Sequence, residues 1–600
     1  MKNLFSFERG WFWLVVLMLR LPAAQAQAPG WNQLALPLSS PTGATFIVAS
    51  AFDASGNIYI MGLTRGTSTF GSTSFNLAQG DAYVAKWSPT SGFVWVVRCG
   101  GAAGSSDLDN SYIRPSSLAV QGNSVYIGGL YSGSTAAFGP TILPNGGQFL
   151  YTTNSFVAKI TDAGASASFA WATRLSYAPT ADGFSLATLG ASSSGIYAAG
   201  YFVGATFAVG STTLTNAGSA GLGDVYLAKL TDAGTSGSVT WAQRAGGPFN
   251  DQAKALAVRG NQVYLTGVTN SPTAVFGNAS APAIGAFNPN VFVARLTDSG
   301  PAGSFDWVAR AGSAAVPSQV TPTTLALSGT SIYVGGIYAG DATFGANALP
   351  TIPLPRANVF VAKLADAGSS GSFQWGLAGG SAKADYVGGL AANGGNVYVG
   401  GRFTGPAATF GPTVLINPSQ PTTLASAVYV AKLTDAGPSG AWAWAQQGGG
   451  VGGNATICQD DATGLLLGAG RGYLVGNLSV LGNTTAPVST VATFGSQVQT
   501  VPGSFHPYIA SWLDNGLLAT APGKAAAPLG LWPNPAHGAA TVRLPAGTDA
   551  VPLLLLDGLG RLVRRYPAPT EAETLLDLRG LPAGLYLLQV GSARQRLTVE

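Results

Sequence analysis

The sequence contains little charge, little cysteine and little histidine. Charged residues are only 9% of the 600 residues, against about 25% in an ordinary soluble domain. The two histidines, His506 and His537, stand beside proline or alanine rather than beside a carboxylate or a nucleophile, so neither fits a catalytic role. Cys99 and Cys458 are the only cysteines. Because no cluster of metal-ligating residues exists in the sequence, we expect no metal site.

Long runs of one residue kind are also missing. The net charge of +4 is spread along the chain without a run of Lys or Arg, which argues against nucleic acid and anionic membranes as partners. The glycine-rich stretch 448–450 lacks a P-loop or dinucleotide fingerprint, and we expect no cofactor. After the N-terminal region, no apolar segment reaches the ~20 residues that a membrane-spanning helix needs.

The N-terminal residues follow the order of a secretory signal peptide. Lys2 and Arg9 supply positive charge, residues 10–18 are apolar, and Ala24-Gln25-Ala26 is an A-x-A cleavage signal. The apolar run is too short for a membrane anchor. We predict that residues 1–26 are a signal peptide that is removed, which leaves no transmembrane segment.

The abundant residues are glycine, with 83 copies, and apolar β-formers, which together are typical of short strands joined by tight turns. They recur in register, about every 70 residues. A segment like VYVGG contains Tyr59, Tyr126, Tyr197, Tyr264, Tyr333, Tyr398 and Tyr473. A segment like VFVAKL contains Ala85, Ala158, Ala228, Ala294, Ala362 and Ala431, with a degenerate seventh copy around Ala510. Such a period indicates a repeat architecture.

Each repeat predicts four antiparallel strands. Strand a is the segment like LAV, strand b is VYVGG, strand c is VFVAKL and strand d carries a tryptophan, with short glycine-containing turns from a to b and from c to d. An ATFG-like tetrad between b and c ends in glycine, except that Ala208 takes this place in the third copy. The repeated tryptophans are Trp31, Trp95, Trp171, Trp241, Trp307, Trp375 and Trp444. Their fixed register favours a structural role between repeats over sugar stacking.

The seventh d strand does not follow its own c strand. Residues 31–36 near the mature N-terminus resemble residues 241–246 and precede the first strand a. We predict that this N-terminal strand pairs with the c strand around Tyr508. The repeats would then close into a ring without an exposed edge.

The pattern GNxVYVGG, ATFG, VFVAKLxDAG and Trp, over residues 31–513, resembles bacterial β-propeller repeats of the SBBP type. This resemblance implies a fold and no particular activity. We predict an all-β chain in which residues 27–518 form a seven-bladed β-propeller of four-stranded blades, because antiparallel four-stranded units repeated radially are typical of propellers.

The last residues abandon the repeat after an Ala/Pro/Gly linker at 519–529. Apolar strands, an Asp-Gly turn and a Pro-Ala-Gly turn predict a small β-sandwich at 530–600. Its ordered motifs closely resemble the type A C-terminal sorting domain of type IX secretion. The motif residues are Pro533, Asn534, Pro535, Asp557, Gly560, Gly584 and Tyr586. The resemblance implies passage across the outer membrane by the type IX machinery.

Acidic residues offer the few candidates for chemistry. The aspartates of the TDAG turns are Asp162, Asp232, Asp298, Asp366 and Asp435. They are candidate ligands or catalysts, but an aspartate in an Asp-x-Gly turn caps its own backbone, and we favour that structural role. Asp460 and Asp461 are the best adjacent carboxylate pair. We expect no catalytic, cofactor-binding or metal-binding residues.

These observations favour a secreted or cell-surface binding scaffold that reaches the outside through the periplasm, with a surface glycan or a protein as ligand. The alternative is a secreted polysaccharide hydrolase or lyase, which would need two acidic side chains facing one pocket. The b–c connections, such as residues 130–155, 405–427 and 477–507, are long and differ between repeats. Since recognition concentrates on variable loops, we expect the ligand on the face that carries the b–c and d–a connections.

Overall fold

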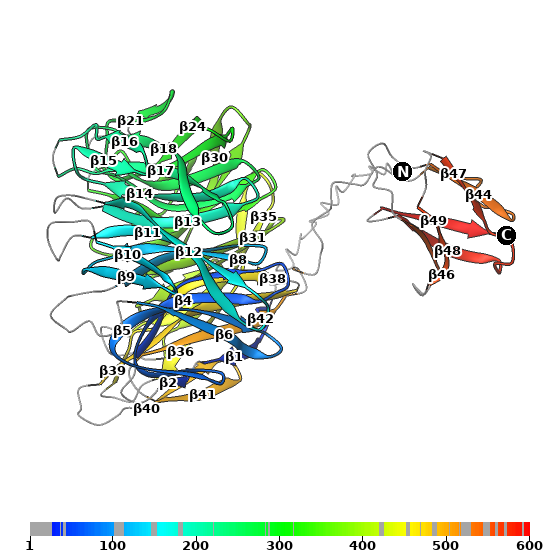
Figure 1. Cartoon of the computed structure of the whole chain (residues 1–600), viewed down its shortest axis with the longest axis horizontal. Helices are drawn as coiled ribbons and strands as arrows, with labels where there is room; N and C mark the ends of the chain where they lie inside the picture. Colours follow the sequence, from blue (N-terminus) through cyan, green and yellow to red (C-terminus); the bar gives the residue numbers. More distant parts are fainter. Residues whose placement is uncertain are drawn as a thin grey trace, which may run out of the picture. The chain divides into compact units, whose positions relative to one another are not determined.

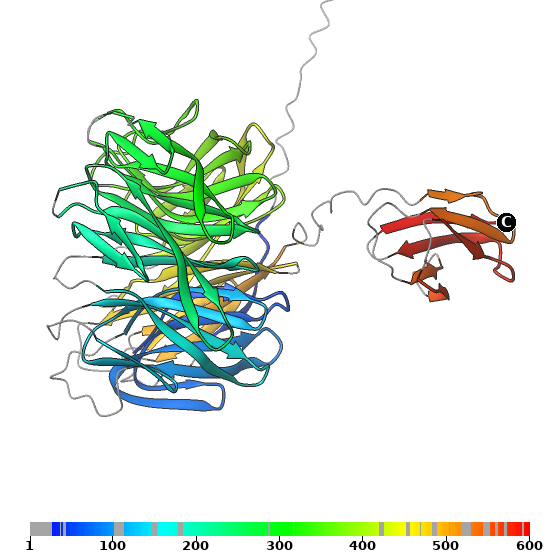
Figure 2. The same cartoon turned by 45° about the horizontal axis from the view of Figure 1, so that its top comes forward.

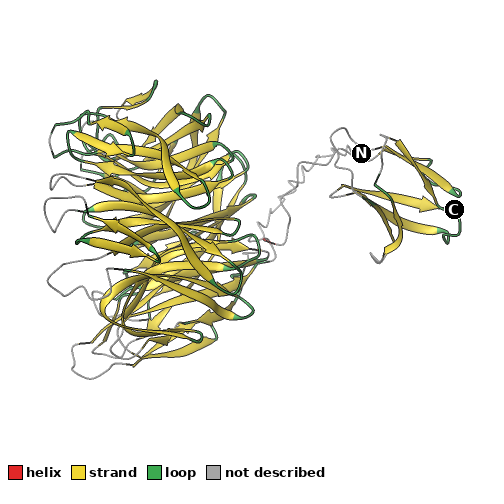
Figure 3. Ribbon diagram, viewed as in Figure 1, coloured by secondary structure: helices red, strands yellow, loops and turns green. Residues whose placement is uncertain are grey.

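The chain is all-β, as expected. The computed structural model describes residues 27–36, 38–39, 44–100, 113–145, 153–177, 184–219, 221–282, 284–285, 288–315, 317–418, 425–451, 456–468, 470–482, 489–502, 505–514, 517, 530–543, 552–557, 562–568, 573–590 and 593–600. In these ranges Figure 3 shows strands and loops and no helix. The expected signal peptide and the linker at 519–529 lie outside them.

The chain divides into an N-terminal module, residues 1–518, and a C-terminal module, residues 519–600. Within the described part of both modules, no helix has the length and apolarity needed to cross a membrane.

Each repeat forms a four-stranded antiparallel sheet, called here a repeat unit, in which strands a, b, c and d lie side by side in that order. Unit 1 consists of β3 (Ala44–Phe52), β4 (Ile58–Phe70), β5 (Thr73–Ser88) and β6 (Gly92–Cys99). Unit 2 consists of β7 (Ile113–Gln121), β8 (Ser124–Tyr131), β11 (Asn154–Asp162) and β12 (Ala167–Tyr177). Unit 3 consists of β13 (Phe184–Ser192), β14 (Gly195–Phe202), β17 (Asp224–Asp232) and β18 (Gly237–Gly246). Unit 4 consists of β19 (Asp251–Arg259), β20 (Gln262–Thr269), β23 (Asn290–Asp298) and β24 (Gly303–Ala311).

The later units repeat this order. Unit 5 consists of β25 (Gln319–Ser328), β26 (Ser331–Ala339), β29 (Asn358–Asp366) and β30 (Gly371–Ser381). Unit 6 consists of β31 (Tyr386–Asn393), β32 (Asn396–Phe403), β35 (Ala427–Asp435) and β36 (Gly440–Val451). Unit 7 consists of β38 (Asp461–Gly468), β39 (Arg471–Gly482), β42 (Phe505–Leu513) and the N-terminal strand β1 (Trp31–Ala35).

Strand c is an inner strand of each sheet and is largely buried. In unit 2, β11 pairs with β8 on one side and β12 on the other, and residues 154–160 are all buried. Because neighbouring units cover both faces of the sheet, this strand is a continuous apolar run instead of an alternation. One core cluster accordingly joins Val84 and Trp95 of unit 1 to Ile127 and Phe156 of unit 2.

The b–c connections of units 2 to 7 contain an extra hairpin. These hairpins are β9 (Thr135–Phe138) with β10 (Thr141–Pro144), β15 (Thr206–Val209) with β16 (Thr212–Thr215), β21 (Thr273–Phe276) with β22 (Ala279–Pro282), β27 (Thr343–Phe344) with β28 (Asn347–Ala348), β33 (Ala407–Phe410) with β34 (Thr413–Ile416), and β40 (Ser489–Phe494) with β41 (Gln497–Pro502). A hairpin extends the preceding unit: β15 pairs with β12, and β21 with β18. In unit 1 the long ends of β4 and β5 form the hairpin, which pairs with β2 (Leu38–Ser39).

A glycine in the left-handed region turns each of these hairpins. In the third copy it is Gly210, with a φ of +59°. The expectation that Ala208 takes this place is therefore wrong, because Ala208 lies within β15, two residues before the turn. The turn requires positive φ, which glycine adopts without a steric penalty.

The N-terminal strand pairs with the c strand of unit 7, as expected, but in a shifted register. Trp31 lies opposite Trp512, and Gln33 lies opposite Ser511. In unit 2, Ile160 has the place of Trp512 in strand c, and the residue opposite Ile160 is Phe169. Trp31 thus has the place of Phe169, and Gln33 has that of the repeated tryptophan. The expected equivalence of Trp31 with the repeated tryptophans is wrong by two residues.

The repeat units contact one another in a series that closes on itself. Strand a of each unit contacts strand a of the next, and β38 of unit 7 contacts β3 of unit 1. Figures 1 and 2 show the blue strands of unit 1 beside the orange strands of unit 7. The Asn477 side chain spans this junction: its oxygen accepts from Ile47 N at 2.7 Å and its nitrogen donates to Ile47 O at 2.9 Å.

The C-terminal module contains two antiparallel sheets. One is formed by β43 (Gly530–Trp532), β44 (Ala539–Arg543) and β47 (Glu573–Asp577), and the other by β46 (Leu562–Tyr566), β45 (Leu553–Leu556), β48 (Gly584–Val590) and β49 (Ala593–Val599). Val542 and Leu576 of the first sheet share a hydrophobic core with Leu555 and Leu588 of the second. This module therefore has a core of its own.

Substitution of Trp31 tests whether the N-terminal strand β1 stabilises unit 7. It is buried, packs against Phe494 and Trp512 with ring centroids 5.1 and 5.8 Å away, and donates from Nε1 to Gln447 O at 2.9 Å. We expect Trp31→Ala to destabilise the N-terminal module by about 3–5 kcal/mol, measured by denaturant unfolding. Trp31→Phe should cost much less, since phenylalanine stands at this place in unit 2. An unchanged stability of Trp31→Ala would contradict this closure.

Candidate functional site

Each c–d turn aspartate accepts hydrogen bonds from the preceding repeat unit. Asp232 of unit 3 accepts from Tyr126 Oη at 2.7 Å, Lys159 Nζ at 2.6 Å and Trp171 Nε1 at 2.9 Å, which belong to strands b, c and d of unit 2. It also accepts from Gly234 N in its own turn. We call this arrangement an inter-unit Asp cluster. Equivalent clusters surround Asp162, Asp298, Asp366, Asp435 and Asp514.

The clusters are charged and mostly shielded from solvent. Burial alone would raise the pKa of Asp232, but the hydrogen bonds from Lys159, Tyr126 and Trp171 outweigh it and lower the pKa to about 2. The most buried pair is Asp298 with Lys229, at 2.6 Å with side chains 1% and 6% exposed. A buried ion pair is favourable only when its remaining polar groups are bonded, and the tyrosine, tryptophan and glycine donors of the cluster meet this condition.

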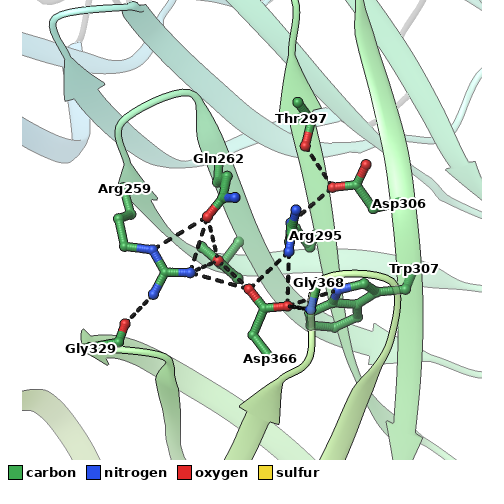
Figure 4. A network of polar contacts seen from close by, with 10 residues as sticks. Arg259, Gln262, Arg295, Thr297, Asp306, Trp307, Gly329, Asp366 and Gly368 are labelled. Carbon is green, nitrogen blue, oxygen red and sulfur yellow. Dashed lines mark hydrogen bonds and ion pairs between the residues drawn. The ribbon is translucent and has the colours of Figure 1, made fainter.

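The cluster between units 4 and 5 uses arginine in place of lysine. Arg295 donates to both oxygens of Asp366 at 2.9 and 3.0 Å, and Arg259 donates to the same carboxylate at 3.2 Å. Figure 4 shows Trp307 and Gly368 on this carboxylate as well. Both Arg295 bonds come from Nη1, and Nε lies 2.9 Å from an Asp306 oxygen, so the cluster persists although its cation differs.

The junction between units 7 and 1 lacks such a cluster among the described residues. Pro89 follows β5 where the other units have aspartate, Ser511 has the place of the lysine, and Gln33 that of the tryptophan. Tyr473 remains and packs against Trp87, with ring centroids 6.2 Å apart. The three polar partners are thus replaced together, which indicates that they act as one set.

The TDAG aspartates cap their own turns, and their carboxylates are also filled by donors from the neighbouring unit. The turn sequence predicts the first contact but not the second. Asp514 was not among the predicted residues, yet it accepts from Tyr398 Oη at 2.8 Å and Lys432 Nζ at 2.9 Å. The signal was present, because Ser511-Trp512-Leu513-Asp514 aligns with Lys-Leu-Thr-Asp of the other repeats.

The repeated tryptophans lie between units. The five that donate to an Asp cluster are Trp95, Trp171, Trp241, Trp307 and Trp375. Trp444 is buried and packs against Tyr398 and Trp512, with centroids 6.1 and 6.3 Å away. Since all six side chains are buried, they are not available for stacking on an external sugar.

Asp460 and Asp461, the carboxylate pair considered for catalysis, have separate partners. Asp460 is buried and accepts from Gly450 N at 2.5 Å and Ser479 N at 3.4 Å, and burial raises its pKa to about 8. Asp461 forms an ion pair with Arg402 at 3.4 Å. Asp460 therefore holds backbone connections together, and Asp461 balances a cation.

A pocket of about 670 Å³ opens on the face that carries the b–c and d–a connections. We call it the cationic pocket. Its lining residues are Pro355, Arg356, Ala382, Lys383, Ala384, Arg402, Thr404, Pro406, Ser426 and Gln459. They come from the b–c connections of units 5 and 6, from the d–a connections on either side of unit 6, and from the end of β32. The sequence analysis missed these cations because no two of them belong to one motif.

A second cavity, of about 260 Å³, lies between the a strands of all seven units. Each a strand has a β-bulge there, and Lys254 of β19 is the one charged residue of its lining. Burial lowers the pKa of Lys254, and its ammonium donates to Gln252 Oε1 at 2.9 Å. The hydroxyls of Ser116 and Thr323 donate to backbone carbonyls, so this cavity is lined largely by groups that serve the strands.

Two of the predicted sorting-motif residues, Asn534 and Tyr586, make hydrogen bonds within the C-terminal module. Asn534 Nδ2 donates to Arg596 O, and Asn534 Oδ1 accepts from Thr598 N, each at 2.8 Å, so the Pro533–Pro535 segment is bound along β49. Tyr586 is buried and donates to Pro582 O at 2.8 Å. Gly584 begins β48 and Asp557 follows β45. Gly560 lies outside the described residues.

The cysteines and histidines are dispersed. Cys99 is a buried free thiol, and burial raises its pKa to about 12. His506 is buried in β42, whereas His537 is exposed and lies 3.2 Å from the Glu600 carboxylate. Within the described residues, no three side chains of the His, Cys, Asp and Glu types gather into a group that could hold a metal ion.

The C-terminal module matches a known family of domains. Residues 530–600 match the family model of the secretion system C-terminal sorting domain. The module is a type IX secretion sorting domain. This confirms the resemblance seen in the sequence, while its assignment to type A and the SBBP resemblance of the repeats stay predictions. A sorting domain of this kind implies export to the cell surface or the extracellular space.

Other similarities are distant. No curated protein matches the sequence. Among solved structures, acylaminoacyl peptidase of Pyrococcus horikoshii is 7% identical with a TM-score of 0.33, over 84% of this chain and 59% of the peptidase. PorZ, a surface component of the type IX secretion system of Porphyromonas gingivalis, is 10% identical with a TM-score of 0.16, over 95% and 100%. Trypanosoma rangeli sialidase is 8% identical with a TM-score of 0.27, over 79% and 93%. Such TM-scores assign neither fold nor activity.

Substitution of a cluster aspartate tests how much an Asp cluster contributes to the free energy of unfolding. Asp298→Ala removes the carboxylate that pairs with Lys229 and leaves a buried cation without its partner, so we expect a loss of about 3–5 kcal/mol in denaturant unfolding. Asp341 is a matched control, because it lies in the b–c connection of unit 5 and accepts there from Thr351 Oγ1. Asp341→Ala should cost only about 1 kcal/mol. Equal losses would contradict a special role of the cluster.

Stability should also depend on pH in two windows. The lowered pKa of the cluster aspartates means that their contribution is complete above about pH 4 and is lost as pH falls further. Burial raises the pKa of Asp385 to about 6 and that of Asp460 to about 8. The folded state then binds more protons than the unfolded state between about pH 4 and 8, so stability falls as pH rises through this window.

Calorimetry of wild type and Asp460→Asn tests the second window. The wild-type melting temperature should fall between pH 5 and pH 8, and Asp460→Asn should flatten this fall by the equivalent of more than about 1 kcal/mol. A pH dependence that is identical in the two proteins would contradict the assignment.

Proposed function

We propose that the chain is a seven-bladed β-propeller followed by a small β-sandwich, and that it acts as a binding scaffold outside the cell. The repeat units would be the blades, and β1 would complete the seventh blade. The type IX machinery would deliver the chain through its sorting domain. The single observation that carries the binding role is the cationic pocket on the face of the variable connections.

The two faces of the proposed propeller have different tasks. The c–d turns on one face are occupied by the Asp clusters, which join successive blades. The b–c and d–a connections lie on the other face, because strands of alternating direction bring alternate connections to opposite ends. Variable connections on a repeated scaffold are where recognition is expected, and the pocket lies among them.

Binding is a better interpretation than polysaccharide cleavage. The ten residues that line the cationic pocket include Arg356, Lys383 and Arg402 but no carboxylate. Of the acids close to this lining, Asp461 is paired with Arg402, and Asp385 and Asp460 are buried. A glycosidase would need a general acid and a second carboxylate across one sugar, which this lining does not offer.

Removal of residues 530–600 tests the delivery. We expect the truncated chain to remain in the periplasm while the full chain reaches the surface or the medium, as followed by cell fractionation and surface proteolysis. The melting temperature of residues 27–518 should stay unchanged, since the C-terminal module has a core of its own. Normal surface delivery of the truncated chain would contradict this part of the proposal.

Two matched substitutions test the binding face. Ala384 is an exposed residue of the pocket wall, and Ala163 is an exposed residue of a c–d turn on the opposite face. Arrays of surface glycans and surface proteins, beside a polysaccharide turnover assay, should reveal binding without turnover by the full chain. Ala384→Trp should fill the pocket and abolish the binding, whereas Ala163→Trp should leave it intact. Turnover by the wild type, or loss of binding only in Ala163→Trp, would overturn the proposal.

A further inference from the structure

We propose that the cationic pocket binds a saccharide chain that bears carboxylate or sulfate groups. This inference rests on the proposed binding function and names the chemistry of its ligand. It is carried by the convergence of three cations and polar side chains around one cavity, with an exposed tyrosine ring against one of the cations.

The first observation is the charge of the lining. Only 29 of the 600 residues are Lys or Arg, yet three of them line this pocket, from three separate segments. Arg356 and Lys383 make no side-chain ion pair within the described part of the chain. Arg402 has one carboxylate partner, Asp461, but both side chains are about one third exposed, at 33% and 36%. Such an exposed pair contributes little and leaves the guanidinium available.

The second observation is the neutral part of the lining. Thr404 Oγ1 donates to Ala384 O at 2.6 Å, and Ser426 Oγ donates to Asp460 O at 2.8 Å. Ser426 is only 2% exposed and shapes the pocket wall, whereas Thr404 is partly exposed at the pocket surface. Gln459 adds an amide that can donate and accept. A volume of about 670 Å³ is within the range of about 300–1,000 Å³ in which small ligands are held.

The third observation is the ring of Tyr386 beside the pocket. The Tyr386 side chain is 45% exposed, and the Arg402 guanidinium lies over its ring, 4.8 Å from the centroid. Tyr386 is outside the lining itself, and Arg402 covers one face of its ring, so the cation that would bind an acidic group lies against an exposed aromatic side chain. Aromatic residues that present one apolar face and one polar edge suit the mixed surface of a sugar ring.

The backbone around the pocket favours a saccharide over an acidic peptide. Extended peptides are commonly bound by adding a strand to a free sheet edge. Arg402 lies on β32, which pairs with β31 on one side and with β35 on the other. The other lining residues belong to connections. The described strand at the pocket therefore offers no free edge to a peptide.

The pocket is held in shape by a buried carboxylate. Asp385 lies under the d–a connection and accepts from Ser381 Oγ at 2.7 Å and from Thr404 N at 3.3 Å. Ser381 Oγ in turn accepts from Lys383 N and Gly405 N, at 3.2 and 3.1 Å. These bonds join the wall that carries Lys383 to the wall that carries Thr404, so Asp385 is a positioning residue. Preorganised walls reduce the ordering cost of binding.

The test uses the full chain and defined probes in isothermal titration calorimetry at moderate salt. The acidic saccharides are oligogalacturonate, which carries carboxylates, and heparin oligosaccharide, which carries sulfates. A neutral dextran oligomer and poly-glutamate are the comparison probes. We expect one or both acidic saccharides to bind, dextran not to bind, and poly-glutamate to bind at least about tenfold more weakly.

The variants Arg356→Gln and Lys383→Gln should each weaken saccharide binding about tenfold, the range expected for one charge-assisted contact. Arg65→Gln is the matched control, because Arg65 is an exposed cation of β4 outside the pocket. It removes the same charge and should leave the affinity unchanged. A melting temperature equal to that of the wild type would show that the fold of each variant is intact.

Three results would overturn the inference. They are no binding of either acidic saccharide, equal binding by the Arg356→Gln/Lys383→Gln double variant, and tighter binding of poly-glutamate, which would assign the pocket to acidic peptides. None of these removes the proposed function, which fails if the wild type turns a ligand over, if Ala384→Trp leaves every detected ligand bound, or if binding is lost only in Ala163→Trp. The two failures are therefore distinguishable.

Discussion

The N-terminal module depends on a carboxylate that one repeat unit places among the donors of the unit before it. A single aspartate accepts from a tyrosine, a cation and a tryptophan that belong to three different strands, as Asp232 does with Tyr126, Lys159 and Trp171. Four-stranded sheets that stack through apolar faces could slide against one another at small cost. A charged, directional contact at the edge of six interfaces fixes the register there, because a misplaced buried cation would be left without a partner.

This constraint divides the work between the two faces of the module. The c–d turns of units 2 to 6 must keep their sequence and length, since each presents an aspartate to its neighbour. The b–c and d–a connections carry no such contact and are free to vary. In unit 6 they frame the cationic pocket, and the buried Asp385 fixes its walls. One face thus holds the proposed ring together, and the other is available for a ligand.

Much of the fold could be predicted from the sequence, because the repeats are local and regular. The a, b, c and d strands follow from short apolar segments separated by turn residues, and the pairing of the N-terminal strand with β42 follows from the missing seventh d strand. The register of Trp31 could not be read in the same way, since it depends on the absence of a TDAG turn before β1.

The neighbour-unit donors to Asp232 lie 61 to 106 residues away, and Arg356, Lys383 and Arg402 meet only in space. The sorting domain was recognisable because its motifs are ordered along the chain, as Asn534 and Tyr586 show.

Native-state hydrogen–deuterium exchange tests the central claim most directly, because it reports the opening of each interface in the intact chain. Six interfaces carry an Asp cluster, and the junction of units 7 and 1 has Pro89, Ser511 and Gln33 in its place among the described residues. If the clusters hold the units together, amides of β3 and β38 should exchange faster than the equivalent amides of β19 and β25, beside the Asp366 cluster. Equal or slower exchange at the junction of units 7 and 1 would contradict the account.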